Sequence, residues 1–294
     1  MSPDQDTFKF GIVIPYFGGA DLEHLDCVRA LTDLGVPLMT VRNHPYIDHA
    51  RAVLASRTLR EMHIQREGQA DQWDTLFWID HDIMGFTPDD VFGLVETCRK
   101  TGCVVSGAYP MKKPGGNMVG AFHPEVIEKG AVRFFEGGEL QSAIGVGMGF
   151  CATPMKVLRD VSLTLPSLRC SDTVVWPFFH HLLTEEPKPP IETYDEPTDG
   201  AYMGEDYSFC RRVIEAGHEI LIDTRIRIEH KGAYKYRLED MGIVVPHCEF
   251  LNVSYQEGNP PPSNAEYEVA QTGSGPQAPG SGLSQALPPN LPGL

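Results

Sequence analysis

Two aspartates separated by one residue follow a short apolar run. Residues 76–79 are all apolar, which is typical of a central strand covered on both faces in an α/β sheet. Ligands collect just beyond the carboxyl ends of such strands. Side chains two apart on an extended backbone point the same way, so Asp80 and Asp82 are placed to share one hard divalent cation, with His81 facing elsewhere. A lone D-x-D motif is nevertheless more often a polar turn.

A second acidic cluster lies far downstream. Gly204, Glu205 and Asp206 come immediately before a predicted helix that stops at Gly217. The positive end of the helix favours the charged form of Asp206, so we expect a low pKa there, and helix capping alone would also account for the residue. Two short strands are predicted at 220–222 and 226–228, and His230 follows the second.

Further candidate ligand contacts surround these clusters. A first strand over 8–14 ends at Pro15, and Pro15 and Tyr16 either line a nucleotide pocket or form a plain turn. Asp48 and Arg51 fall near the start of a predicted helix over 52–60, where a contact to ribose or phosphate and a simple N-cap are equally supported. Lys231 opens a basic and aromatic loop suited to closing over a diphosphate.

The remaining patterns predict the scaffold. Helices are expected over 21–34 and from 88 to about 100, with a short helix opening at Thr153 and Pro154, strands over 37–41 and 104–106, and a hairpin region over 118–140. Lysines 112 and 113 are interpreted as solvated rather than near a diphosphate. Glycines 145, 147 and 149 are not a dinucleotide fingerprint, and allow close approach of a ligand or a neighbouring strand. The aromatic run 176–181 favours core over a ligand platform.

Composition limits the class of protein. The 294 residues carry a formal net charge of −16, which argues against a broad nucleic-acid surface. The seven cysteines include no C-x-x-C pair, so a disulfide framework or structural zinc site is not indicated and a cytoplasmic location is expected. We expect no membrane span, since no apolar run reaches about 18 residues. A domain over 1–255 and a disordered tail over 256–294 are predicted.

With these motifs together, the chain resembles the GT-A-fold, nucleotide-sugar-dependent glycosyltransferases from about residue 8 to 236. The resemblance implies a Rossmann-like, mixed and mostly parallel sheet flanked by helices in a single domain. It also implies that Asp80, Asp82 and His230 hold Mn²⁺ or Mg²⁺ on the donor diphosphate. The base that takes the acceptor proton would be Asp206 first and Glu205 second.

The function expected is therefore transfer of a hexose from a nucleotide donor, a UDP- or GDP-sugar, to a hydroxyl acceptor. The donor would meet the residues singled out above, which are Pro15, Tyr16, Asp48, Arg51, Asp80 and Lys231. The acceptor stays open among a glycan, a protein, a small molecule and a modified base, and so does the stereochemical course. Two alternatives are a sugar-phosphate nucleotidyltransferase, which usually has a glycine-rich loop ending in Arg and Lys that this chain lacks, and a non-catalytic sugar-binding module on the same fold.

Overall fold

The structure is a computed structural model. It describes residues 8–64, 73–112, 117–170, 173–183, 202–232, 234–238, 248–254 and 266–271. No helix within these ranges is long and apolar enough to cross a membrane.

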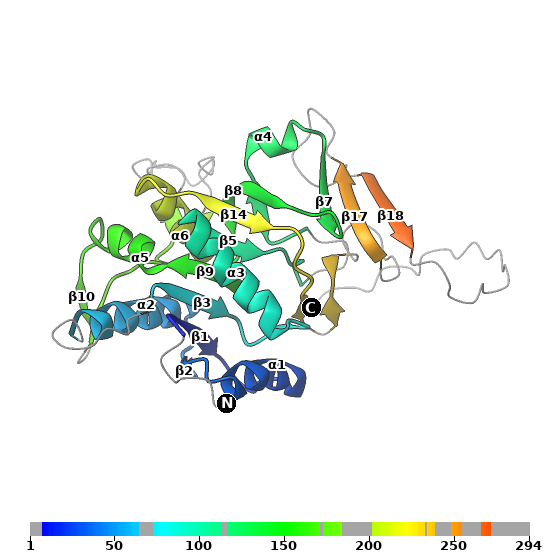
Figure 1. Cartoon of the computed structure of the whole chain (residues 1–294). Helices are drawn as coiled ribbons and strands as arrows, with labels where there is room; N and C mark the ends of the chain where they lie inside the picture. The colour runs from blue at the N-terminus through cyan, green and yellow to red at the C-terminus, as the bar shows by residue number, and fades with distance from the viewer. Residues whose placement is uncertain are drawn as a thin grey trace, which may run out of the picture.

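A mixed eight-stranded sheet forms the centre of the fold (Figure 1), with strand order β2-β1-β3-β9-β5-β14-β8-β6. Its strands are β1 (Phe10–Tyr16), β2 (Leu38–Arg42), β3 (Thr75–Ile79), β5 (Val104–Gly107), β6 (Gly120–Phe122), β8 (Leu140–Val146), β9 (Phe150–Pro154) and β14 (Ile220–Asp223). Strands β8 and β9 run against the other six, as their pairings show. The predicted mixed, mostly parallel sheet flanked by helices is confirmed.

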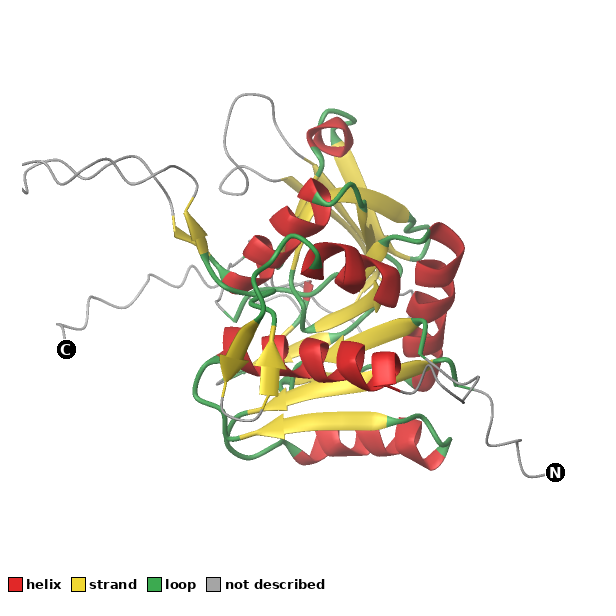
Figure 2. Ribbon diagram, turned by 90° about the vertical axis from the view of Figure 1, so that its left-hand side faces the viewer, coloured by secondary structure: helices red, strands yellow, loops and turns green. Residues whose placement is uncertain are grey.

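Helices cover both faces of this sheet (Figure 2). They are α1 (Leu22–Asp33), α2 (Ile47–Ile64), α3 (Pro88–Thr101), α4 (Pro124–Ile127), α5 (Met155–Ser162) and α6 (Glu205–Glu215). Strand β3 alternates between two apolar clusters: Phe77 and Ile79 pack with residues of α1 and α3, and Leu76 and Trp78 pack with residues of α2, α5 and α6. Because both faces are covered, all five residues of β3 are buried, as the continuous apolar run predicts.

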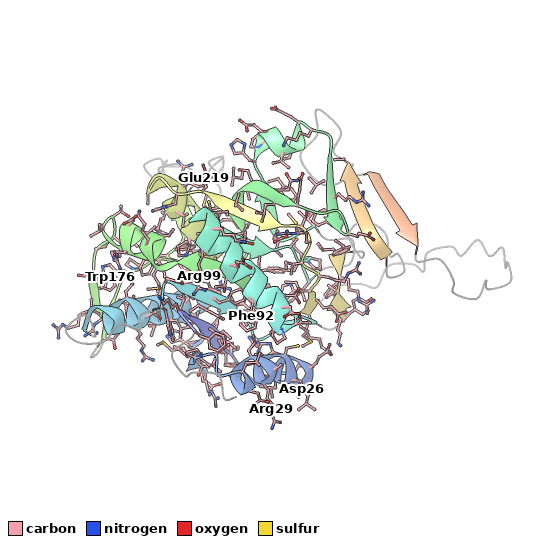
Figure 3. All side chains as sticks on the ribbon, in the orientation of Figure 1. Asp26, Arg29, Phe92, Arg99, Trp176 and Glu219 are labelled. Atoms are coloured by element: carbon pink, nitrogen blue, oxygen red, sulfur yellow. The ribbon has the colours of Figure 1, made fainter. Side chains whose placement is uncertain are left out.

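Helix α3 shows how local sequence fixes these elements. Thr87 and Asp90 form a reciprocal capping box around Pro88 at the first turn, and Gly102 ends the helix with a φ of 71° that favours glycine. Near that end, Arg99 reaches Asp74 at 2.9 Å, just before β3 begins (Figure 3). Helix α1 carries Asp26 and Arg29 on its exposed outer side, also labelled in Figure 3.

A small three-stranded sheet brings the late part of the chain to the end of β3. Strand β15 (Glu229–Lys231) lies between β16 (Lys235–Tyr236) and β4 (Ile83–Met84), and His230 is directly opposite Ile83. The strand predicted over 226–228 is wrong, because regular pairing begins only at Glu229. The apolar side chains of Ile226 and Ile228 are buried in the core instead.

Other short strands lie outside the central sheet. Strand β7 (Ala131–Phe135) pairs with β17 (Cys248–Ser254), which pairs with β18 (Glu266–Gln271). Strands β10 (Leu168–Cys170) and β11 (Thr173–Val175) form one pair, and β12 (Leu182–Leu183) and β13 (Tyr202–Met203) another. The hairpin predicted over 118–140 is wrong, since β6 pairs with β8 and β7 joins a different sheet.

One strand pairing crosses the predicted boundary between domain and tail at residue 255. Strand β18 falls inside the range 256–294 assigned to the tail, and it pairs with β17 along its length. The remainder of that range lies outside the described residues, so the boundary at 255 stays a prediction.

Candidate functional site

A cavity of about 380 Å³ opens beyond the ends of β1 and β3. Eight of the predicted site residues line it, and they come from five places in the chain: Pro15, Tyr16, Arg51, Asp80, Asp82, Glu205, Asp206 and His230. Asp48 lies in the first turn of α2 and does not line this cavity. Lys231 lines a neighbouring cavity. The fold therefore brings the two acidic clusters and the late histidine to one hollow.

Arg51 joins the two acidic clusters. Its Nη2 donates to Asp80 Oδ2 at 2.7 Å, and its Nη1 donates to Glu205 Oε1 at 3.2 Å and to Asp206 Oδ1. The side chain is only 2% exposed. Burial alone would lower the pKa of Arg51, but the charges of Asp206, Asp80 and Glu205 raise it above its ordinary value. The guanidinium is thus a fixed positive charge that holds three carboxylates at one wall of the cavity.

This arrangement gives Arg51 a position that its sequence context did not indicate. It is the fifth residue of α2, past the free backbone N–H groups of the first turn, and its two terminal nitrogens are taken up by carboxylates. A contact between Arg51 and a donor nucleotide stays a prediction.

Asp206 differs from expectation in its acidity. It is the second residue of α6, where the helix N-terminus was expected to favour its charged form. Burial raises the pKa of Asp206 to about 7, and the charge of Arg51 and the hydrogen bond from the backbone N of Met148 to Oδ2, 3.1 Å, offset this only in part. Desolvation therefore outweighs the helix dipole, and a carboxyl group with a pKa near neutrality is suited to accept a proton.

Asp82 is about as exposed as Asp80 but has different partners. Its Oδ2 accepts from Lys112 Nζ, and its Oδ1 lies 3.6 Å from His230 Nε2. Burial would raise the pKa of Asp82, but the neighbouring His230 side chain and the hydrogen bond and charge of Lys112 hold it well below its ordinary value. The carboxylate is therefore ionised across the physiological range and is available as a ligand.

The hydrogen bond made by His230 determines which form of its ring nitrogen Nε2 faces Asp82. Its Nδ1 is 2.8 Å from the carbonyl oxygen of Pro110, which can only accept, so Nδ1 carries the proton. A neutral imidazole then has a lone pair on Nε2, facing a carboxylate oxygen that also offers only lone pairs. A histidine whose second nitrogen donates to a carbonyl oxygen is the usual arrangement in metal ligation.

Two buried carboxylate oxygens also support a metal site at Asp80 and Asp82. Oδ1 of Asp80 and Oδ1 of Asp82 are buried and accept no hydrogen bond from the described residues. Such atoms are costly unless a cation or donor satisfies them. Carboxylate oxygens and one imidazole are donors that suit Mn²⁺ or Mg²⁺, so the residues fit such an ion. Within the described ranges, however, no three His, Cys, Asp or Glu side chains converge into a complete metal centre.

A second cavity of about 490 Å³ adjoins the first. The two share His81, Asp82 and Lys112. The remaining wall is formed by the loop before α1 and by β4 and β15, through Gly19, Ala20, Asp21, Met84 and Lys231. Lys231 Nζ lies 3.6 Å from Asp21 Oδ2. Lys112, interpreted from the sequence as solvated, is exposed and lines both cavities.

Sequence analysis missed Tyr109 at the floor of the first cavity. Its hydroxyl accepts a hydrogen bond from Gly149 N at 2.8 Å, and its ring packs edge-on against His230 with centroids 5.2 Å apart. Burial raises the pKa of Tyr109 well above its ordinary value, so it remains protonated. A Cβ on Gly147 or Gly149 would collide with the Tyr109 hydroxyl. Glycine is therefore needed at both positions for close packing below the site. The sequence signal that could have identified Tyr109 was its position soon after β5.

Within the aromatic run 176–181, the two phenylalanines are core, as predicted, whereas the flanking residues are half-buried or exposed. Phe178 and Phe179 are fully buried, and Phe179 stacks on Phe209 of α6 with centroids 4.7 Å apart. The guanidinium carbon of Arg51 lies 5.8 Å from the Phe179 ring centroid. These rings therefore support Arg51 from below rather than offering a platform to a ligand.

No family model and no curated protein matches this sequence. Among solved structures, the chain is similar to the A197 protein from STIV, with 16% identity over 76% of this chain and 85% of that chain and a TM-score of 0.44. It is also similar to GalNAc-T7 in a structure with UDP, GalNAc and Mn²⁺, with 11% identity over 82% of this chain and 46% of that chain and a TM-score of 0.41. Neither likeness is close enough to assign an activity.

Proposed function

We propose that this chain is a metal-dependent glycosyltransferase that moves a hexose from a UDP- or GDP-sugar to a hydroxyl acceptor. The observation that carries the proposal is the convergence of carboxylates more than a hundred residues apart, Asp80 with Glu205 and Asp206, on one buried arginine beside Asp82 and His230. A single cavity at the carboxyl end of a central strand receives all of them.

The acidic edge next to β3 would bind the donor diphosphate through a divalent ion. Asp80, Asp82 and His230 would hold Mn²⁺ or Mg²⁺, which supplies positive charge to the departing diphosphate when bound. Pro15 and Tyr16 line the same cavity at the end of β1 and would contact the nucleoside. The Tyr16 hydroxyl is fixed 3.2 Å from Nε2 of His24, whose Nδ1 donates to the Ile83 carbonyl at 2.9 Å.

Asp206 is the proposed general base. As the acceptor oxygen bonds to the anomeric carbon, the bond from that carbon to the diphosphate breaks, its electron pair leaves with the diphosphate, and the hydroxyl proton passes to the Asp206 carboxylate. A pKa of about 7 matches this task. Arg51 keeps Asp206 and Glu205 side by side, and Glu205 is the second candidate for the same role.

The deciding experiment measures release of nucleoside diphosphate from a panel of UDP- and GDP-sugars with Mn²⁺, with Mg²⁺ and with chelator, in the presence of mixed hydroxyl acceptors. We expect cation-dependent release from one donor class. Asp82→Ala should abolish it, and Asp26→Ala on the exposed side of α1 should not. Absence of turnover with every donor and cation would disprove the proposal.

Two further measurements separate the alternatives from this proposal. A nucleotidyltransferase would consume a nucleoside triphosphate and a sugar phosphate and release pyrophosphate. A non-catalytic sugar-binding module would bind the nucleotide sugar in calorimetry without turnover, and that binding would survive Asp206→Asn.

A further inference from the structure

The two aspartates of the D-x-D motif have cationic partners of opposite character. Asp80 is paired with Arg51, which is 2% exposed and tied to two further carboxylates. Asp82 is paired with Lys112, which is 39% exposed and forms no other ion pair with a described residue. Arg51 cannot leave without stranding buried charges, whereas Lys112 can leave at little cost because water can solvate its ammonium group.

The second cavity can receive the ammonium group of Lys112. Lys112 lines the second cavity as well as the first, and Lys231 also lines the second cavity. The backbone N of Lys231 donates to the carbonyl oxygen of Asp82 at 2.7 Å, which fixes Lys231 relative to the motif. A flexible four-carbon side chain allows the Lys112 ammonium to turn from Asp82 toward Lys231 while its backbone stays in place.

The charges of the second cavity depend on what Asp82 holds. While Lys112 is paired with Asp82, and Lys231 faces Asp21 at 3.6 Å, each ammonium group is offset by a carboxylate. A divalent cation on Asp82 would neutralise that carboxylate and leave the Lys112 charge uncompensated. The cavity would then carry a net positive charge beside the cation, which favours an anion with several oxygens.

We propose that Lys112 is an exchangeable counter-ion of Asp82: a divalent cation displaces its ammonium group into the second cavity, where it forms with Lys231 a binding site for a diphosphate group. This rests on the proposed function, since it places the donor diphosphate across the two cavities. It also sets an order of binding, with the cation first and the diphosphate second.

The first test measures binding of Mn²⁺ alone, by calorimetry or by the loss of its free electron spin resonance signal. Lys112→Met removes the competing ammonium group, so we expect Mn²⁺ to bind roughly tenfold more tightly, equal to about 1.4 kcal/mol. Lys112→Arg keeps a charge and should bind as the unmodified protein does. Lys231→Met is the matched control in the same cavity, paired with Asp21 rather than Asp82, and should leave Mn²⁺ affinity unchanged.

The second test titrates inorganic pyrophosphate into protein saturated with Mn²⁺. Both Lys112→Met and Lys231→Met should weaken pyrophosphate binding by roughly tenfold, because each removes one ammonium group from the proposed site. Lys156→Met, on the exposed side of α5, should not change it. Melting temperatures of all variants establish that they are folded.

The outcomes separate this inference from the proposed function. It is overturned if Lys112→Met binds Mn²⁺ no more tightly than the unmodified protein, or if no variant binds Mn²⁺. If Mn²⁺ and pyrophosphate binding depend on Lys112 as expected but no nucleotide sugar is turned over, the inference stands and the glycosyltransferase proposal fails. If a nucleotide sugar is turned over in a cation-dependent way but Lys112→Met binds Mn²⁺ as the unmodified protein does, the glycosyltransferase proposal stands and this inference fails.

Discussion

The two sides of the cavity are built on different principles. On the side of α2 and α6, a buried arginine holds three partly buried carboxylates, and the geometry is fixed before any ligand arrives. On the side of β4 and β15, Asp82 meets a half-exposed lysine and a histidine at 3.6 Å, and one carboxylate oxygen has no hydrogen bond. The first side is preorganised for positioning, and the second is arranged for exchange of a cation.

The largest expected effect comes from the fixed side. Arg51→Met leaves Asp80, Glu205 and Asp206 close together without their shared cation, and we expect the free energy of unfolding to fall by about 4 kcal/mol. Denaturant unfolding measures this. Arg57→Met, an exposed arginine on the same helix, is the matched control and should cost less than about 0.5 kcal/mol. Equal stability of the two variants would show that Arg51 is not the structural centre of the site.

The next effect concerns catalysis without loss of binding. Asp206→Asn keeps the size of the side chain but removes the proton acceptor, so we expect turnover to fall by about a thousandfold with donor affinity unchanged. Steady-state kinetics together with calorimetric titration of the donor separate the two quantities. Glu215→Gln, at the opposite end of α6, should turn over normally. Near-normal turnover by Asp206→Asn would exclude Asp206 as the base.

A smaller effect is expected on the exchange side. Asp82→Ala removes the carboxylate between Lys112 and His230, and we expect donor affinity with Mn²⁺ to fall by roughly a hundredfold, to the level measured with chelator. The free energy of unfolding should change little, since Lys112 is half exposed. Titration of the donor with and without Mn²⁺ gives the comparison, and an unchanged Mn²⁺-dependent affinity would contradict it.

The smallest effect is on the pH dependence of stability. The pKa of Asp206 is raised to about 7 in the folded protein, so the folded state retains this proton more strongly than the unfolded chain. The resulting stabilisation is fully present below about pH 4 and is lost as the pH rises through 7. Asp206→Asn should flatten the fall in unfolding free energy between pH 4 and 7, by up to about 1.4 kcal/mol per pH unit. Parallel pH profiles for the two proteins would contradict the shift.

Sequence patterns predicted the scaffold because its signals are local. The apolar run before Asp80 identified β3, and the capping residues around Pro88 placed the start of α3 to the residue. Strand β1 continues to Tyr16 rather than ending at Pro15, since Tyr16 still pairs with Arg42 of β2. The mixed, mostly parallel sheet was implied by the resemblance to the GT-A-fold glycosyltransferases rather than by these local signals.

Tertiary contacts were harder to predict. The cluster around Arg51 joins residues about 150 positions apart, and nothing local shows that this arginine is buried. The acidity of Asp206 was predicted in the wrong direction, because helix position is visible in the sequence and desolvation is not. Lys112 is exposed, as interpreted, but its pairing with Asp82 was not visible, since the two residues are distant in the chain.

The position of β14 in the sheet has a consequence for biosynthesis. This strand lies between β5 and β8, although the chain makes both of those strands long before it. A nascent polypeptide released only up to Gly204 has Arg51 and Asp80 but lacks their two later acidic companions and the strand that closes the sheet. Assembly of the sheet therefore has to wait until β14 has been translated, and chains shortened before it should be recognised by chaperones as incomplete rather than accumulate in folded form.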